Sequence, residues 1–184
     1  MTLVLLAVAA GLALGAGALY NGLVRLRNQV AAAWAQIDVQ LKRRHDLIPN
    51  LVGAVQGYMQ HERELFERIA VARTRARAAA GAGPVGAAEG ALGREISSLL
   101  AVMERYPDLK ADQHVLALQE ELVTTENRIG FARQLYNDLV ARYNTRQQVF
   151  PANLVAGALG FRPAELFQAD SVDRELPPVD LPPR

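Results

Sequence analysis

Titratable residues gather in the segment "LKRRHDLIPNLV", residues 41–52, where a run of five charged or titratable side chains precedes Pro49. The run consists of Lys42, Arg43, Arg44, His45 and Asp46. Together with the distant Glu126, the neighbouring His45 and Asp46 could bind an ion or small ligand, or serve a hydrolase. The same segment can also have a purely structural role, because it lies inside a long amphipathic helical pattern.

The architectural interpretation starts from spacing. Asp38, Lys42 and Asp46 follow one another at four-residue intervals, which places opposite charges in a ladder on one helix face. Pro49 has no amide hydrogen for the carbonyl of His45, and a proline inside a helix costs about 3 kcal/mol or more. The side chains of Arg43, Arg44 or Asn50 could satisfy that carbonyl. We therefore predict a helix kink supported by polar side chains, with a ligand pocket at the kink as the alternative.

The spacings of known catalytic and metal sites are not found. "HEREL" at His61 lacks the second histidine of a zinc-protease helix, because Leu65 stands there. No histidine follows a glutamate by three residues, as a di-iron bundle requires, and the chain has no cysteine. Glu120, Glu121 and Glu126 could act as acid or base, but a solvated or paired helix face is preferred. We expect no enzyme, no cofactor and no metal.

A second polar cluster lies on the helix expected over residues 113–149. Its members are Glu126, Asn127, Arg128, Arg133, Tyr136, Asn137, Tyr143 and Asn144. The tyrosine-asparagine pair at Tyr136 recurs seven residues later at Tyr143, which stacks both pairs along one side of the helix. We interpret these residues as polar contacts between helices that fix register, with a binding site as the alternative.

Apolar spacings of three, four and seven predict helices throughout, and no alternating strand pattern is found. One amphipathic stretch runs from about residue 20 to 79 and is long enough to need a bend or break. Glycines and Pro84 predict a flexible connection over residues 78–93, followed by a helix over 89–106. Asp112 is expected to cap the next helix, a short apolar segment covers 153–159, and the proline-rich residues 168–184 are expected to be extended.

The helix over 113–149 has the clearest apolar seam. We expect its seam at Val115, Leu118, Leu122, Thr125, Ile129, Ala132, Tyr136, Leu139, Tyr143 and Phe150. Such a seam packs against neighbouring helices. The predicted fold class is all-α: an amino-terminal transmembrane helix that continues into a long antiparallel bundle resembling a four-helix bundle.

Residues 2–19 carry no charge and would extend about 27 Å as a helix, close to the roughly 30 Å of a bilayer core. We expect a retained anchor at 1–19 and a bundle at 20–167. A signal peptide cleaved after Ala18 is the alternative, although its positive amino-terminal region is missing. Arg25 and Arg27 follow the span, so the positive-inside bias places the amino terminus outside and the bundle in the bacterial cytoplasm.

Two expectations concern partners. Ala7, Gly11 and Gly15 recur every fourth residue, which would allow two membrane helices to approach closely and form a homo-oligomer. The net charge of +1 and pI of about 8.1 do not indicate nucleic-acid binding. The expected partners are the lipid bilayer and other, unidentified proteins of the membrane or the soluble phase.

Several sequence blocks resemble the LemA family of bacterial membrane-anchored helical proteins. They are "YNGLVRLRNQV" (20–30), "AWAQIDVQLKRRHDLIPNLV" (33–52), "YMQHE" (58–62), "YPDLKAD" (106–112), "LQEELVTTENRIGFARQLYNDLVARYN" (118–144) and "FPANLVAGALGF" (150–161). The resemblance implies an amino-terminal membrane helix of the inner membrane, a small external amino terminus and a long antiparallel bundle. It implies no catalytic residue set.

Three functional hypotheses follow. The first is a non-enzymatic scaffold or protein-interaction module at the membrane surface. The second is a ligand or ion sensor, or a hydrolase, that uses the polar groups around His45, Asp46 and Glu126. The third is a membrane-remodelling protein whose helices lie on lipid, although many acidic residues among the basic ones disfavour it.

Overall fold

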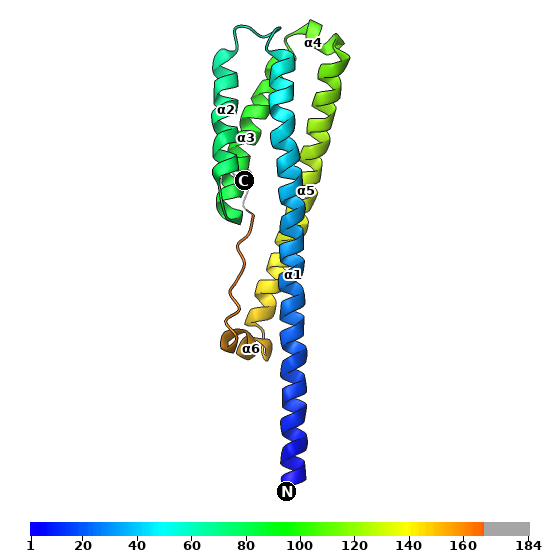
Figure 1. Cartoon of the computed structure of the whole chain (residues 1–184), viewed down its shortest axis with the longest axis vertical. Helices are drawn as coiled ribbons and strands as arrows, with labels where there is room; N and C mark the ends of the chain where they lie inside the picture. Colours follow the sequence, from blue (N-terminus) through cyan, green and yellow to red (C-terminus); the bar gives the residue numbers. More distant parts are fainter. Residues whose placement is uncertain (168–184) are drawn as a thin grey trace, which may run out of the picture. The chain divides into compact units, whose positions relative to one another are not determined.

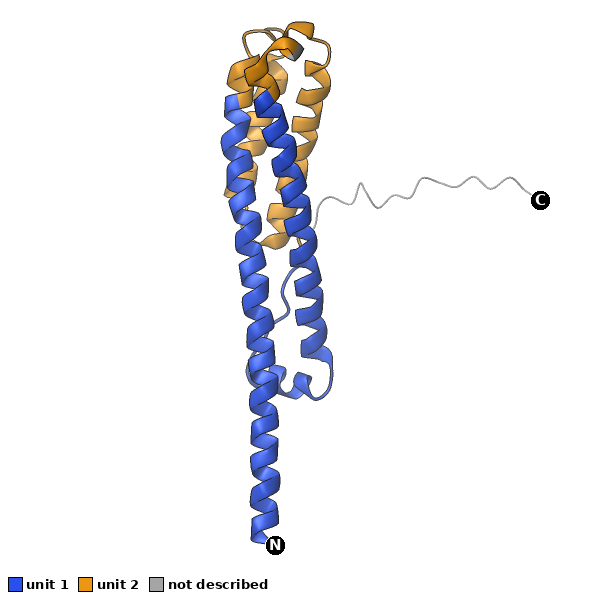
Figure 2. Ribbon diagram, turned by 90° about the vertical axis from the view of Figure 1, so that its right-hand side faces the viewer, with its two compact units in different colours: residues 1–50, 117–166 blue, residues 51–116, 167–184 orange. Residues whose placement is uncertain are grey.

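The computed structural model describes residues 1–167, and within them it contains helices and turns but no strand. The described chain divides into two compact units (Figure 2). Unit 1 comprises residues 1–50 and 117–166, and unit 2 comprises residues 51–116 together with Phe167. The prediction of an all-α chain is confirmed, and the expectation of an extended tail at 168–184 lies outside the described residues.

The first helix, α1, runs from Thr2 to Val55 without interruption (Figure 1). The predicted continuation of the amino-terminal apolar helix into the rest of the chain is therefore confirmed. The predicted bend or break in the stretch from 20 to 79 falls after Val55, and α2 begins only at Arg63. The amides of Tyr58 and Met59 both donate to the Val55 carbonyl, at 3.0 and 3.1 Å, which closes the helix in a tight turn.

The amino-terminal part of α1 is the one described helix long and apolar enough to cross a membrane. Every side chain from residue 2 to 18 is exposed. Exposure of so many leucines and valines is unfavourable in water, whereas it is favourable in hydrocarbon. The bounds of the anchor at 1–19 and of the bundle at 20–167 remain predictions.

Unit 2 corrects our expectation for residues 78–93. Helix α2 spans Arg63–Ala78 and helix α3 spans Ala82–Met103, so only residues 79–81 connect them. Gly81 has a φ of 91°, a conformation that favours glycine, and Pro84 lies in the first turn of α3, where its missing amide breaks no helical hydrogen bond. Packing of α2 against α3 therefore outweighs the cost of the glycines.

The α2 and α3 helices form an antiparallel hairpin. Arg68 of α2 is paired with Glu95 of α3 at 3.0 Å, and near the other end Glu62 accepts a hydrogen bond from the Tyr106 hydroxyl at 3.3 Å. Ile69, Leu92 and Leu99 are fully or almost fully buried in this unit. The short helix α4, Pro107–Ala111, follows α3 and leads into α5.

Helix α5 spans Gln113–Gln148, and its cap is the predicted one. The Asp112 carboxylate accepts hydrogen bonds from the amides of His114 at 2.9 Å and Val115 at 3.3 Å. A side chain that accepts these otherwise unpaired amides starts a helix. Helix α6, Ala152–Ala158, follows α5 and includes most of the predicted apolar segment.

In unit 1, α1 and α5 run antiparallel and side by side (Figures 1 and 2). Arg44 of α1 contacts Glu126 of α5, and Trp34 of α1 contacts Tyr136 of α5. Trp34 lies ten residues before Arg44, and Tyr136 lies ten residues after Glu126. Ile37 of α1 and Val140 of α5 are completely buried. Equal steps on both helices mean that one register holds along this contact.

The predicted seam of α5 is confirmed over most of its length and wrong near its end. The buried seam residues are Val115, Leu118, Leu122, Thr125, Ile129, Tyr136 and Tyr143. Val140 is completely buried where we expected Leu139, and Gln147 is buried where we expected Phe150. The strict four-residue step from 136 to 140 keeps the seam facing α1, because a straight helix has 3.6 residues per turn and a heptad spacing drifts around it.

Candidate functional site

Two arginines of α1 reach glutamates of α5 within unit 1. Arg43 contacts Glu121, with Nη2 and Nε at 2.6 and 3.1 Å from Oε1, and the two side chains are 48% and 41% exposed. Arg44 contacts Glu126, with Nε at 2.6 Å from Oε1, but Arg44 is only 3% exposed and Glu126 38%. Consecutive arginines on α1 thus pair with glutamates of similar exposure, but Arg43 is exposed and Arg44 is buried.

The remaining residues of the first predicted cluster lie along α1 with different burial. His45 is buried. Asp38, Lys42, Asp46, Pro49 and Asn50 are exposed. Pro49 lies inside α1, which continues for six more residues to Val55. The charge ladder and the kink at Pro49 remain predictions.

Tyr136 of α5 is buried between two partners. Its ring lies 5.4 Å from the Trp34 ring of α1, measured between centroids, and its hydroxyl donates a 2.8 Å hydrogen bond to the carbonyl oxygen of Glu165. We expected polar partners on neighbouring helices. The partner of the hydroxyl is instead a backbone atom of the extended segment that follows α6.

Asn144 fixes the same segment through both ends of its side-chain amide. Its Nδ2 donates to the Ala164 carbonyl at 2.9 Å, and its Oδ1 accepts from the Ala164 amide at 2.9 Å. One asparagine therefore imitates the hydrogen-bond pair of a neighbouring strand. We call Tyr136, Asn144 and the backbone of 164–165 the segment clamp.

The segment clamp gives a first testable prediction. Asn144→Ala should make the amide of Ala164 exchange with deuterium at least about tenfold faster, because each lost hydrogen bond is worth about 1 kcal/mol. Asn127→Ala, on the same helix but exposed, is the matched control and should leave exchange at Ala164 unchanged. Equal exchange in both variants would show that the clamp does not hold the segment.

Burial affects the acidity of both tyrosines. It raises the pKa of Tyr136 above its ordinary value of 10.0, and the nearby Glu165 carboxylate adds to this effect. Burial also raises the pKa of Tyr143, although the positive charge of Arg27 opposes it. In both cases the folded chain holds the phenolic proton more tightly than the unfolded chain does.

A pH dependence follows with a definite sign. The stability associated with Tyr136 is fully present below the unfolded pKa of about 10 and is lost as pH rises through the higher folded pKa. Chemical denaturation of the chain in detergent at pH 8 and 11 should show this loss. Tyr136→Phe should lose less stability between the two pH values than the parent chain. An identical loss in both would contradict the prediction.

The other residues of the α5 cluster do not join one site. Asn127 and Arg128 are exposed, whereas Arg133 and Asn137 are half-buried. Among the described residues no group of three or more histidine, aspartate and glutamate side chains is placed to hold a metal ion. The predicted cluster thus divides into the Arg44–Glu126 pair and the segment clamp.

The membrane-helix residues Ala7, Gly11 and Gly15 are exposed, and a methyl group added at either glycine would meet open space. Their predicted role in homo-oligomer contact remains a prediction.

Unit 2 carries a polar cluster that was not predicted from the sequence. The Tyr58 hydroxyl lies 3.4 Å from the Asp112 carboxylate, and Glu62 contacts both the Tyr106 hydroxyl and Arg105, at 3.3 and 3.7 Å. These contacts join the blocks "YMQHE" and "YPDLKAD", which are 44 to 54 residues apart in sequence. The sequence contained a signal for this cluster, because both blocks combine a tyrosine with an acidic residue beside a helix break.

Next to this cluster lies an open groove of about 620 Å³ between the end of α1 and α2. Its lining residues are Val52, Gln56, Met59, Gln60, Arg63, Phe66, Glu67 and Ala70. Arg63 and Glu67 on its rim pair with each other at 3.2 Å. The groove does not include the residues around His45 that the sensor hypothesis uses.

Several contact residues of unit 1 were not among the predicted site residues. Trp34 packs on Tyr136, and Phe161 packs edge-on against Tyr20 with 5.9 Å between ring centroids. The guanidinium of Arg27 lies 5.5 Å from the centroid of the same Phe161 ring. All of these aromatic residues fall within or beside family-like blocks, but only the fold shows which ring meets which.

Several bacterial proteins are similar to this chain in sequence. The chain is similar to magnetosome protein MamQ 2 of Paramagnetospirillum magneticum, at 27% identity over 189 residues covering 89% of this chain and 67% of the relative. It is also similar to magnetosome protein MamQ of Magnetospirillum gryphiswaldense, at 24% identity over the same shares. Protein LemA of Metamycoplasma hominis is 27% identical over 160 residues, covering 84% of this chain and 71% of the relative. A family model described as the LemA family matches residues 33–181, and the chain therefore belongs to the LemA family.

Proposed function

We propose that this protein is a non-enzymatic scaffold that the amino-terminal part of α1 anchors in the bacterial inner membrane and that binds other proteins at the membrane surface. The exposed apolar residues 2–18 support the anchor, because their transfer from water to hydrocarbon is favourable. The names of the relatives are not names of enzymes. The positive-inside bias of Arg25 and Arg27 supports a cytoplasmic location for the residues that follow the span.

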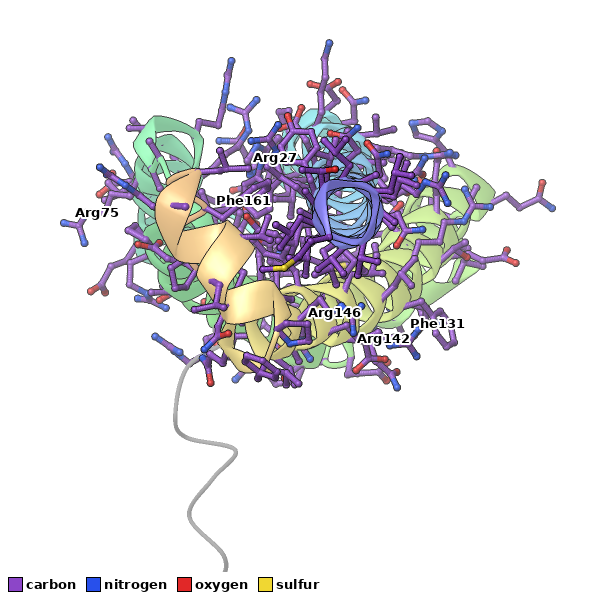
Figure 3. All side chains as sticks on the ribbon, turned by 90° about the horizontal axis from the view of Figure 1, so that it is seen from below. Arg27, Arg75, Phe131, Arg142, Arg146 and Phe161 are labelled. Atoms are coloured by element: carbon purple, nitrogen blue, oxygen red, sulfur yellow. The ribbon has the colours of Figure 1, made fainter. Side chains whose placement is uncertain are left out.

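The observation that carries the scaffold proposal is an apolar strip on the outer side of α5 in unit 1. Phe131 is 74% exposed and Leu135, one turn further on, is 53% exposed. Figure 3 shows the Phe131 ring projecting away from the helices. A large apolar residue on a helix whose opposite face is already buried is typical of a protein contact.

Site-specific photocrosslinking in living cells tests this proposal. A photoreactive phenylalanine analogue at Phe131 should give discrete protein crosslinks, and the additional change Leu135→Glu should abolish them by charging the same strip. Crosslinks that are absent, or that persist undiminished with Leu135→Glu, would contradict a protein contact on this strip.

The alternatives have less support. A ligand or ion sensor around His45, Asp46 and Glu126 needs these groups to converge on a cavity, whereas Glu126 pairs with the buried Arg44. A thermal-shift screen with metals and metabolites tests it, since a ligand at one hundred times its Kd adds about 2.7 kcal/mol of stability. Membrane remodelling by the helices would require a fragment that lacks the anchor, residues 1–19, to bind liposomes.

A further inference from the structure

The short helix α6 buries its small residues and exposes its large apolar residues, the reverse of what is usual in water. Its small residues Ala152 and Ala156 are buried, whereas Leu154 and the following Leu159 are exposed. Phe150, just before the helix, is 75% exposed. A segment that turns alanines inward and large apolar residues outward leaves most of its apolar surface for something other than water. We call residues 149–159 the α5–α6 corner.

The register of unit 1 places this corner where the exposed apolar part of α1 begins. The pair Trp34 and Tyr136 is followed, seven residues along each helix, by Arg27 and Tyr143, which interact electrostatically. Tyr20 lies seven residues before Arg27 on α1, and Phe150 lies seven residues after Tyr143, two residues past the end of α5 at Gln148. Phe161, just after the corner, packs against Tyr20 itself. Figure 1 shows α6 beside α1, with the first residues of α1 extending beyond it.

The level of Tyr20 is also the expected level of the membrane surface. Residues 2–19 would cross about 27 Å as a helix, which nearly fills a hydrocarbon core of about 30 Å. Tyrosine at the end of a span is typical of the interface between lipid and water. At this level the exposed Phe150, Leu154 and Leu159 would face the region where acyl chains and headgroups meet.

The charge of this end matches an anionic lipid surface. The basic residues near the corner are Arg25, Arg27, Arg142, Arg146 and Arg162, and within the described residues 160–167 the acidic residue is Glu165. Figure 3, viewed from the amino-terminal side, shows Arg27 beside Phe161 and both Arg142 and Arg146 on α5. Each basic residue near an anionic bilayer adds to its attraction, whereas acidic residues would oppose it.

We propose that the α5–α6 corner docks on the bilayer, with Phe150, Leu154 and Leu159 inserted at the interface and the surrounding arginines on anionic phospholipid headgroups. Unit 1 then contacts the membrane at two points, the span and the corner, which fixes its orientation to the membrane. This inference rests on the anchor in the proposed function. A second copy of the chain is a less suitable occupant, because its own corner would bring an equal excess of arginines.

The test uses the full chain in liposomes with dyes at single positions. The chain has no cysteine, so one introduced cysteine takes one environment-sensitive dye. Phe150→Cys and Leu154→Cys report on the corner. Phe131→Cys is the matched control, because Phe131 and Phe150 are 74% and 75% exposed and Phe131 lies about 26 Å before the end of α5 at Gln148. Gly11→Cys reports on insertion of the span.

In vesicles of phosphatidylglycerol and phosphatidylcholine, brominated lipids should quench the dyes at Phe150 and Leu154 severalfold more strongly than the dye at Phe131. Vesicles of phosphatidylcholine alone should weaken this quenching. If the dye at Gly11 is quenched but the dyes at Phe150 and Leu154 are quenched no more than the dye at Phe131, the docking is overturned and the anchor is retained. Corner dyes shielded from aqueous iodide yet insensitive to brominated lipids would show a second copy there, and would also overturn it. No quenching at Gly11 would overturn the anchor itself.

Discussion

Glu126→Gln is expected to lower the free energy of unfolding of unit 1 by about 2 kcal/mol, because it removes the carboxylate charge that lies 2.6 Å from Nε of the buried Arg44. Removing one partner of a buried pair costs about 3–5 kcal/mol, and the partial exposure of Glu126 reduces this, since water can approach the glutamine that replaces it. Denaturation of the detergent-solubilised chain, followed by the fluorescence of its single tryptophan, measures the effect. Trp34 is a suitable probe because it packs on Tyr136 in the same unit.

The neighbouring pair supplies the matched control. Glu121→Gln removes the same charge from the same helix, but both Arg43 and Glu121 remain largely hydrated. An exposed pair contributes about 0.2–1 kcal/mol, so its loss should be barely measurable. A cost for Glu121→Gln equal to or above that for Glu126→Gln would show that burial of Arg44 does not determine the energy of the pair.

Leu92→Ala is expected to cost about 3 kcal/mol in unit 2. Leu92 is completely buried in α3, and truncating a buried leucine loses both its transfer free energy and the packing around the cavity that remains. Amide exchange in α2 and α3 should accelerate by about a hundredfold, since 1.4 kcal/mol corresponds to a factor of ten. The result bears directly on the glycine-rich segment, because a flexible connection would have no such packing to lose.

Ser97→Ala is the control in the same helix. Its side chain is exposed, so a change of at most about 0.5 kcal/mol is expected. If Leu92→Ala altered exchange as little as Ser97→Ala does, α3 would not pack on α2 as the structure describes.

Much of the fold follows from local patterns in the sequence. The apolar span, the seam of α5 and the cap at Asp112 were predictable, because hydrophobic period and side-chain capping act between residues a few positions apart. The cluster around Arg44 and Tyr136 was likewise recognised as polar structure. Its partners were not identified, since Ala164 and Glu165 carry no distinctive side chain and take part through their backbone.

The errors arose where packing outweighs local preference. Glycines and Pro84 predicted a flexible connection, but contact with α2 stabilises α3 through the same residues, and the proline lies where a helix tolerates it. The shift of the seam to Val140 and Gln147 has a similar cause, because only contact with α1 shows which residues of the last turns are buried.

By itself the sequence determined that this chain is helical, that its first residues suit a membrane and that it resembles the LemA family, because these properties depend on composition and short spacings. Only the tertiary structure decided that the Arg44 side chain is buried and the Arg43 side chain exposed, and that Asn144 binds the backbone of Ala164. The same holds for the exposure of Leu154 in α6 and of Leu159 just after it. Burial and pairing depend on which segments meet in space, and residues distant in sequence carry no local sign of that meeting.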